Sequence, residues 1–181
     1  MAFGVVLDTC VLYPYSLCDV LLRLAERELY DPYWSERILE ELERTLVKDR
    51  HTPEQAARRI AAMRRTFPSA VVPADAVQRL ERAMTNDEGD RHVLAAAVAS
   101  PAEAVITFNL RDFPVESCEP HEIEAVHPDA FLIGLYDLDP PTVETSIEAQ
   151  AAALRRPPIS RPELIEMLMR SVPRFAARLK H

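Results

Sequence analysis

The sequence contains little glycine and little cysteine, and each scarcity excludes a class of site. Only three of the 181 residues are glycine, so the chain cannot assemble the glycine-rich loop that binds phosphates in P-loop and dinucleotide-binding proteins. The three cysteines are odd in number and none have CxxC spacing, which argues against a disulfide framework and against a thiolate zinc site. We therefore expect a protein of a reducing compartment, the cytoplasm.

Long apolar runs and an excess of positive charge are also missing. The chain has no run of 18 apolar residues and no signal-peptide pattern, so we expect neither membrane insertion nor export. Lys plus Arg total 21 against 29 Asp plus Glu, for a formal net charge of -8. Such a protein repels a polyanion unless cations or local basic patches intervene, so the net charge argues weakly against a nucleic-acid partner.

The residues that are present predict a packed α/β protein. Hydrophobic residues make up 48% of the chain, which suits one globular domain with an extension. Residues 3–8 and 103–108 are valine- and isoleucine-rich runs typical of strands buried on both faces, and shorter strands are predicted at 70–72 and 123–126. Because helical segments separate these strands, we expect an α/β/α sandwich around a mainly parallel sheet.

Helices are predicted from apolar spacing and from capping residues. The expected helices lie around 17–24, after the N-cap Ser35, after the capping box of Thr52 and Gln55, at about 75–84, and after Gly89. From residue 128 onward only helices are predicted, at about 128–137, at 142–155 and after the N-cap Ser160. We therefore expect one compact domain over 1–127 and a helical extension over 128–181 that packs on this domain or on a partner.

Acidic residues follow the two main predicted strands. Asp8 closes the first strand, and Asp112 lies in "NLRD" just after the other. Because the carboxyl ends of parallel strands share one edge of the sheet, Asp8 and Asp112 should be neighbours. Asp90 shares a helical face with apolar residues that must pack on the sheet, and a carboxylate there needs a partner. His92 points the other way and is expected at the surface or in loop packing.

The predicted helix after Ser35 carries three glutamates in "ILEELERTL". A rotation of about 100° per residue places Glu40 farthest from the apolar stripe and puts Glu41 and Glu43 at its edges. Glu40 is thus the least suited to face the site. The pattern alone leaves Glu41 and Glu43 as alternatives.

Several carboxylates at one edge of the sheet suggest a divalent cation. Carboxylates without cationic partners raise one another's pKa unless a metal ion neutralises them. Ligation by oxygen alone favours Mg²⁺ or Mn²⁺ over zinc. Such an ion activates water and stabilises charge on a phosphoryl group, so an acidic nuclease is the function that these residues predict.

Four segments resemble a known family. "VVLDTCVLYP", "YWSERILEELERTL", "DEGDRHVLAAAV" and "VITFNLRDFP" occur in the order and spacing of a PIN domain and cover about residues 3–130. The sequence most resembles VapC-type toxins of bacterial toxin-antitoxin pairs, and the helical tail is similar to an extension found in a subset of them. The resemblance implies an endoribonuclease that uses Mg²⁺ or Mn²⁺, an RNA substrate, a cognate antitoxin protein as inhibitor, and a homodimer.

Carried over by position, the resemblance assigns roles to individual acids. It makes catalytic residues of Asp8, Glu41, Asp90 and Asp112. It makes metal ligands of Asp8, Asp90 and Asp112, although Asp112 could instead lie behind the ligands. It also selects Glu41 over Glu43.

The chain departs from the family pattern beside these acids. Cys10 stands where many PIN domains have Asn, and Asn109 stands where many have Asp, so one negative charge fewer should weaken metal binding. Supporting roles are expected for Thr9, Asp87, Thr107 and Asn109. Asp87 is either an added ligand or a favourable charge at a helix start, and Thr9 either donates a hydrogen bond to the acids or caps the strand end.

Two arginines flank the predicted site, and two further functions stay open. Arg111 and Arg91 are expected to contact RNA, whereas the arginines of the helix after Thr52 are expected to form a solvated face. Because of Asn109, one alternative function is that of a catalytically weak PIN-like module that binds RNA or protein. A DNA-directed nuclease is the third alternative.

Overall fold

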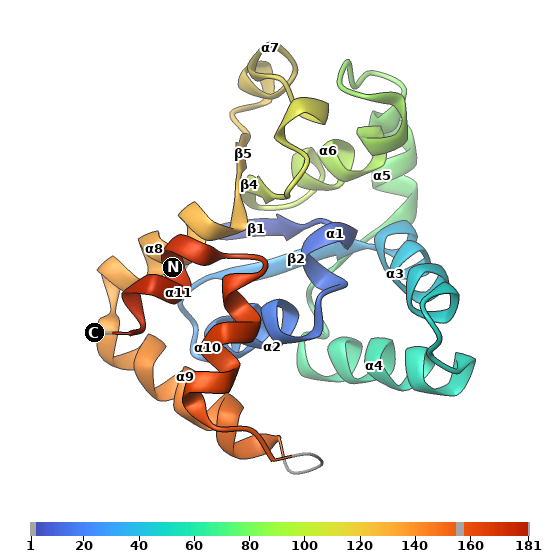
Figure 1. The fold of residues 1–181 in the computed structure, drawn as a ribbon. Helices are drawn as coiled ribbons and strands as arrows, with labels where there is room; N and C mark the ends of the chain where they lie inside the picture. The colour runs from blue at the N-terminus through green and yellow to red at the C-terminus, as the bar shows by residue number, and fades with distance from the viewer. Residues whose placement is uncertain (1–2, 155–157, 181) are drawn as a thin grey trace.

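A parallel five-stranded sheet forms the centre of the protein, as the computed structural model in Figure 1 shows. The structure describes residues 3–154 and 158–180. The strands are β1 (Gly4–Leu7), β2 (Asp31–Ser35), β3 (Val71–Val72), β4 (Ala102–Ile106) and β5 (Glu124–Val126). Their order is β3-β2-β1-β4-β5, and every neighbouring pair is parallel. The expected α/β/α fold is therefore confirmed.

The central strand β1 is buried along its whole length. Val5, Val6 and Leu7 have no exposed surface, which agrees with the unbroken apolar run in the sequence. A Cβ atom at Gly4 would lie 2.6 Å from the carbonyl oxygen of Pro101. Glycine therefore lets β1 start this close to the chain that enters β4.

Helices cover both faces of the sheet. Along the first two thirds of the chain they are α1 (Thr9–Leu12), α2 (Tyr15–Glu26), α3 (Glu36–Lys48), α4 (Pro53–Thr66), α5 (Ala74–Glu81), α6 (Arg91–Val98) and α7 (Val115–Cys118), with single turns η1 (Glu88–Asp90), η2 (Leu110–Asp112) and η3 (Glu119–His121). α5 and α6 lie on one side of the sheet, and α2 lies on the other (Figure 1). The predicted N-cap of α3 and the capping box of α4 are both formed.

Strand β2 is the one described strand that the sequence did not reveal. Its segment "DPYWS" contains Pro32, and proline is rarely found inside a central strand because it has no N–H to donate. In the structure β3 pairs only with Trp34 and Ser35. Pro32 therefore faces no neighbour on that side and leaves no hydrogen bond unmade.

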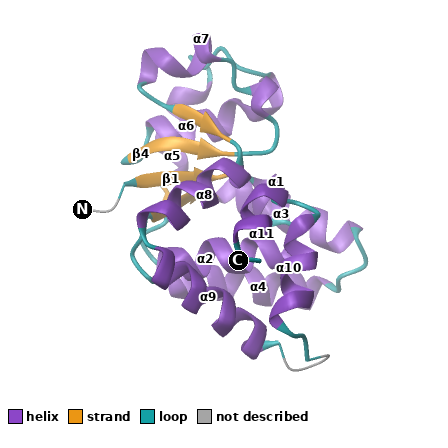
Figure 2. Cartoon of the chain, turned by 60° about the vertical axis from the view of Figure 1, so that its left-hand side comes forward, coloured by secondary structure: helices purple, strands orange, loops and turns teal. Residues whose placement is uncertain are grey.

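Among the described residues after β5, four helices pack on one another and on α2 (Figure 2). They are α8 (Pro128–Leu138), α9 (Pro140–Ala153), α10 (Arg161–Met169) and α11 (Pro173–Arg178). The side-chain amide of Gln150 donates to the carbonyl oxygen of Ser16 at 2.9 Å, and the Phe131 ring lies 5.0 Å from that of Tyr30. Residue 155, the last of the predicted 142–155 helix, lies outside the described residues, and the division of the chain at residue 127 stays a prediction.

Within the described residues, no helix combines the length and the apolar character that crossing a membrane requires.

Candidate functional site

The site is built on the ends of the two central strands. Asp8 directly follows β1 and is 4% exposed. Thr107 directly follows β4, is fully buried, and donates from Oγ1 to Asp8 Oδ2 at 2.8 Å. The N–H of Asn109 in turn donates to Thr107 Oγ1 at 3.0 Å. This chain of hydrogen bonds fixes one oxygen of Asp8 and ties the two strand ends together.

Cys10 completes the support of Asp8. Its Sγ donates to Asp8 Oδ2 at 3.2 Å and accepts from the N–H of Phe108 at 3.3 Å. Burial, together with the neighbouring Asp8 carboxylate, raises the pKa of Cys10 to about 12. The thiol therefore keeps its proton at neutral pH and acts as a neutral donor where many PIN domains carry an amide.

Among the acids of the site, Asp90 is the one whose ionised form is most clearly disfavoured by its surroundings. It is the N-terminal flanking residue of α6 and is partly buried. Burial, followed by the charges of Asp8, Asp112 and Asp87 in that order, raises its pKa to about 6. Four carboxylates from three separate segments therefore lie close enough to act on one another.

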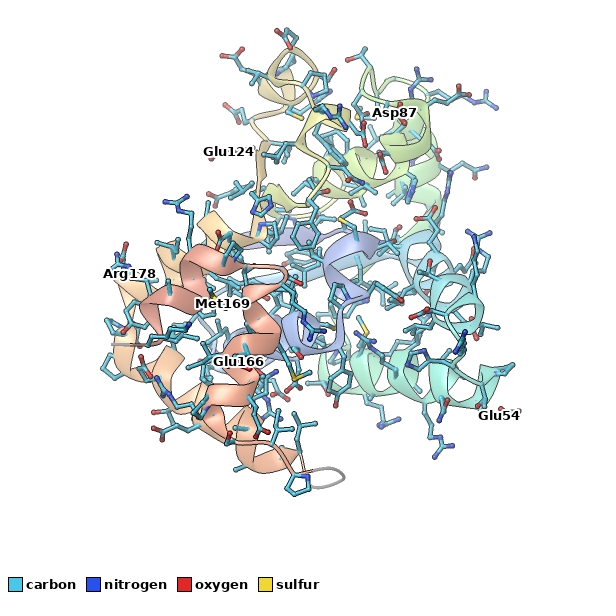
Figure 3. All side chains as sticks on the ribbon, in the orientation of Figure 1. Glu54, Asp87, Glu124, Glu166, Met169 and Arg178 are labelled. Carbon is cyan, nitrogen blue, oxygen red and sulfur yellow. The ribbon has the colours of Figure 1, made fainter. Side chains whose placement is uncertain are left out.

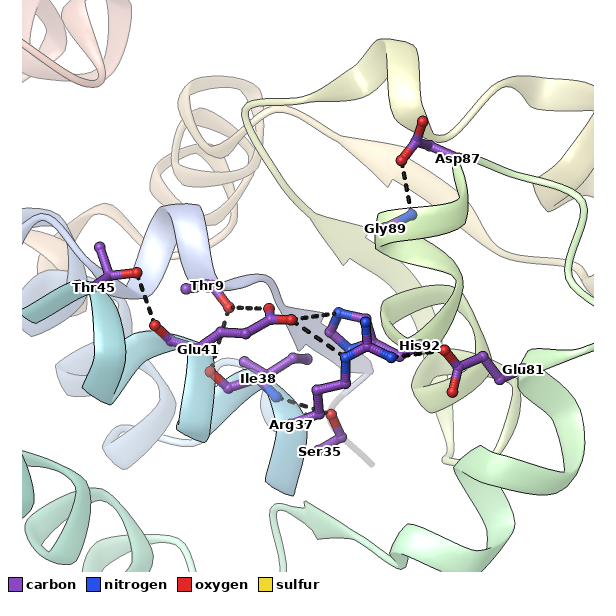
Figure 4. Close-up of polar contacts among 10 residues, drawn as sticks. All are labelled: Thr9, Ser35, Arg37, Ile38, Glu41, Thr45, Glu81, Asp87, Gly89 and His92. Atoms are coloured by element: carbon purple, nitrogen blue, oxygen red, sulfur yellow. Dashed lines mark hydrogen bonds and ion pairs between the residues drawn. The ribbon is translucent and has the colours of Figure 1, made fainter.

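The loop before α6 is attached to the segment after β4. The N–H of Asp87 donates to the carbonyl oxygen of Asp112 at 3.2 Å, and the N–H of Asp90 donates to that of Asp87 at 3.0 Å. The Asp87 carboxylate accepts from the N–H of Gly89 at 2.9 Å (Figure 4). This turn brings Asp87, Asp90 and Asp112 to the same side of the sheet as Asp8.

Glu41 joins the site from α3, while Glu40 on the same helix is exposed. Glu41 Oε2 accepts a hydrogen bond from the hydroxyl of Thr9 at 3.2 Å. Its Oε1 lies 3.2 Å from His92 Nε2 and 3.4 Å from Arg37 Nε (Figure 4). Burial raises the pKa of Glu41, but His92, Thr9 and Arg37 outweigh burial and lower it overall.

The expectation for His92 was wrong. The side chain is fully buried and faces Glu41 rather than the surface. Asp90 ends the turn η1 and precedes α6, so the regular rotation from Asp90 to His92 that the sequence suggested does not hold. Nε2 of His92 lies close to Glu41 Oε1 without meeting the geometry of a hydrogen bond.

The arginines differ in the partners that their guanidinium groups contact. Arg111 is exposed and no ion pair of it is formed among the described residues, whereas Arg91 Nε donates to the carbonyl oxygen of Asn86 at 3.3 Å. On α4, Arg64 is paired with Glu36. Figure 3 shows Glu54, at the start of α4, far from Asp87. Arg59 departs from the expected solvated face, because its guanidinium donates to the carbonyl oxygen of Tyr13 at 3.3 Å and to that of Leu12, close to Asp8 in the chain.

The donors suit a hard divalent cation. They are carboxylate oxygens, the ligands that Mg²⁺ and Mn²⁺ prefer. No Lys or Arg forms an ion pair with Asp8, Asp87, Asp90 or Asp112 in the described part of the chain. Among the same residues no three His, Cys, Asp or Glu side chains are already gathered tightly enough to hold an ion. The donor atoms are therefore of the kind that binds Mg²⁺ or Mn²⁺. The four acids lie near one another, but their oxygens do not converge on one point.

A family model described as "PIN domain" matches residues 4–111, which is more than half of the chain. The chain belongs to the PIN domain family. This match confirms the resemblance drawn from the sequence, and a second model, "VapC50 C-terminal domain", matches residues 128–181.

One curated relative of this PIN domain protein is the "Putative ribonuclease VapC50" of Mycobacterium tuberculosis (strain ATCC 25618 / H37Rv). It is 41% identical over 98 residues, which are 54% of this chain and 58% of the relative. The match thus spans little more than half of the relative's length. No solved structure gives a significant match.

Two residues of the site escaped the sequence analysis, His92 and Arg37. His92 lies in a run of buried residues from 92 to 97, so the sequence offers no polar face on which to place it. Arg37 is one of many charged residues on α3. Arg37 reaches Glu41 from one turn earlier on the same helix, whereas His92 reaches it because α3 and α6 both pack against β2.

Proposed function

We propose that this PIN domain protein is a metal-dependent endoribonuclease that acts as the toxin of a toxin-antitoxin pair. The observation that carries the proposal is the group of Asp8, Asp87, Asp90 and Asp112. Burial and the charges of the other three acids disfavour ionisation of Asp90, and no Lys or Arg of the described residues is ion-paired with any of the four. The likeness to a relative named as a ribonuclease supports the same function.

Asp8, Asp90 and Asp112 would hold Mg²⁺ or Mn²⁺, and Asp87 would be an additional donor. When bound, the ion lowers the pKa of water and offsets the negative charge that grows on a phosphoryl group. The ion also offsets the mutual repulsion of the acids, so its binding releases the electrostatic cost that Asp90 carries in its absence.

The remaining residues orient these acids and the substrate. Thr107 and Cys10 hold one oxygen of Asp8, which leaves the other oxygen of Asp8 for the metal. Asn109 is exposed at the strand end, where its side-chain amide can orient a water or a phosphate oxygen. Arg111, two residues further on, offers its guanidinium to an RNA phosphate.

A cognate antitoxin would act on the same acids. A guanidinium or ammonium group inserted among Asp8, Asp90 and Asp112 would neutralise them and exclude the metal, and guanidinium matches carboxylates in a bidentate manner. We place the protein in the cytoplasm with its RNA substrate. A homodimer is a further proposal that follows from the family.

The decisive experiment is cleavage of defined RNAs with Mn²⁺ and with EDTA. We expect cleavage in Mn²⁺, none in EDTA, and a loss of at least roughly 100-fold for Asp8→Asn, the size of effect seen when one electrostatic stabiliser is removed. Glu40→Gln is the matched control, because Glu40 is an exposed acid on α3 outside the site.

Single-stranded DNA is assayed in parallel. Cleavage of DNA but not of RNA would show that the protein is a DNA-directed nuclease instead. Binding of RNA without cleavage would show that it is a binding module. Equal turnover by Asp8→Asn and the unaltered protein would reject the proposed site.

A further inference from the structure

The carboxylate of Glu41 contacts two segments that carry the acids, the one that follows β1 and the one that begins α6. Thr9, the residue after Asp8, donates its hydroxyl to Oε2 at 3.2 Å and to the carbonyl oxygen of Ile38 at 3.3 Å. His92, two residues after Asp90, approaches Oε1 to 3.2 Å. One side chain on α3 therefore contacts the segment of Asp8 and the segment of Asp90 at once (Figure 4).

Arg37 links this group to a fourth element. Its Nε lies 3.4 Å from Glu41 Oε1, and its guanidinium pairs with Glu81 on α5 at 2.8 Å. α5 packs against α6, the helix that carries His92. Glu81, Arg37, Glu41 and His92 thus form a continuous row of charged and polar groups across α5, α3 and α6.

His92 has a position that packing alone does not explain. It is fully buried in a helix whose next five residues, Val93 to Ala97, are apolar and buried too. A buried imidazole without polar contacts costs more than an apolar side chain of similar size. Neither ring nitrogen meets the geometry of a hydrogen bond with a described residue, and the polar group that His92 meets is the Glu41 carboxylate, 3.2 Å from Nε2.

Both oxygens of Glu41 are therefore engaged inside the protein. Oε2 is taken by Thr9, and Oε1 by His92 and Arg37. None of the four acids described above is among these partners. A carboxylate that accepts hydrogen bonds from Thr9 and Arg37 and lies against the buried imidazole of His92 is poorly placed to serve as a metal ligand as well.

We propose that His92 and Arg37 are positioning residues that hold Glu41 as a brace between the Asp8 and Asp90 segments, so that Glu41 acts on the metal site through the placement of these two acids. This role replaces the catalytic role that the family resemblance gave Glu41. It rests on the proposed function in so far as Asp8 and Asp90 bind the metal.

The test is a double-mutant cycle read out as Mn²⁺ affinity by calorimetry or by electron paramagnetic resonance, with the full chain and without RNA. The variants are Glu41→Gln, His92→Phe and the two combined. We expect each single substitution to raise the dissociation constant for Mn²⁺ roughly 10-fold, as loss of a group that orients ligands does. The double variant should bind no more weakly than either single variant, because both remove the same brace.

Two further variants separate positioning from packing. His92→Gln keeps an N–H donor in the buried site and should recover part of the affinity that His92→Phe loses. Glu43→Gln changes a partly exposed acid on the same helix and should leave the affinity unchanged. Thermal unfolding of each variant establishes that it is folded before metal is added.

Three outcomes would overturn the inference. In the first, Glu41→Gln weakens Mn²⁺ binding strongly and the double variant loses the product of the single effects, which makes Glu41 a direct ligand. In the second, His92→Phe binds Mn²⁺ as the unaltered protein does, which makes His92 a packing residue. In the third, the unaltered protein binds no Mn²⁺, which rejects the proposed function as well. Non-additive Mn²⁺ binding without RNA cleavage would reject the proposed function and leave the brace standing.

Discussion

At the scale of single residues, the site carries an electrostatic cost that falls on Asp90. Its pKa of about 6 lies above the ordinary 3.8 because the group is partly buried among other acids. The folded state therefore disfavours the ionised carboxyl. The stability that the protein has below pH 3.8 is reduced as pH rises through about 6, where Asp90 must ionise in the folded protein.

Replacing Asp90 with Asn should therefore stabilise the metal-free protein at pH 7. The difference in pKa corresponds to about 3 kcal/mol, and solvent screening at a partly buried group reduces this to about 1–2 kcal/mol. Urea unfolding in EDTA measures the free energy of unfolding of both proteins. The gain should be full at pH 7 and should vanish below about pH 3, where Asp90 is protonated in both states.

Metal supplies the control for this prediction. Addition of Mn²⁺ should stabilise the unaltered protein more than Asp90→Asn, because ligand binding to the folded state adds to stability. A variant that is less stable than the unaltered protein at pH 7 in EDTA would show that the Asp90 charge is compensated by groups other than a metal.

At the scale of elements, the strand ends could be predicted because two physical rules act together. A valine-rich run identifies β1 and β4 as buried strands, and parallel pairing places their carboxyl ends at one edge. Asp8 and Thr107 therefore meet in the structure as the strand order requires. The capping residues Ser35 and Thr52 are equally local signals, and both caps are formed.

Such local rules do not predict which way the side chains of helix α6 point. Its residues 92 to 97 are all buried, so the helix has no polar face from which an orientation could be read. The turn η1 before it also changes the rotation between Asp90 and His92. The Glu41 carboxylate that His92 meets is 51 positions away on α3. The two residues come together because α3 and α6 both pack against β2, which periodicity does not encode.

The junction between α8 and α11 offers a test at the element scale. Asp129 on α8 is 5% exposed and accepts from the N–H groups of Arg174 and Phe175 at 3.1 and 2.8 Å. Because these N–H groups open α11 and have no partner within it, Asp129→Ala should lower the free energy of unfolding by roughly 2 kcal/mol. Urea unfolding measures the loss, and hydrogen exchange should show it first in α11.

Asp137→Ala is the matched control for Asp129→Ala. Asp137 lies on the same helix and pairs with Arg178 of α11 at 2.8 Å, but both side chains are about half exposed. An exposed pair of this kind contributes less than about 1 kcal/mol. Equal losses for Asp129→Ala and Asp137→Ala would show that the buried cap is not what joins the two helices.

At the scale of the whole molecule, the net charge of -8 and the proposed RNA substrate are compatible only through bound cations. The acids that contribute to the negative charge at the site are the same groups that would bind metal. Metal binding therefore lowers the local charge at the point where a phosphate must approach. The exposed Arg111 adds a positive group at that edge, whereas Arg64 of α4 is already paired with Glu36.

The helical extension should be required for the fold of the whole chain. α9 and α10 pack on α2, whose residues Leu17, Leu21 and Leu24 are almost entirely buried. A chain that ends at residue 127 exposes part of this apolar face and should therefore aggregate or lose cooperative unfolding. Size-exclusion chromatography and thermal unfolding followed by circular dichroism compare it with the full chain, and co-expression of residues 128–181 as a separate chain should restore a soluble complex. A monomeric 1–127 fragment with the same melting temperature as the full chain would instead make the extension an independent unit.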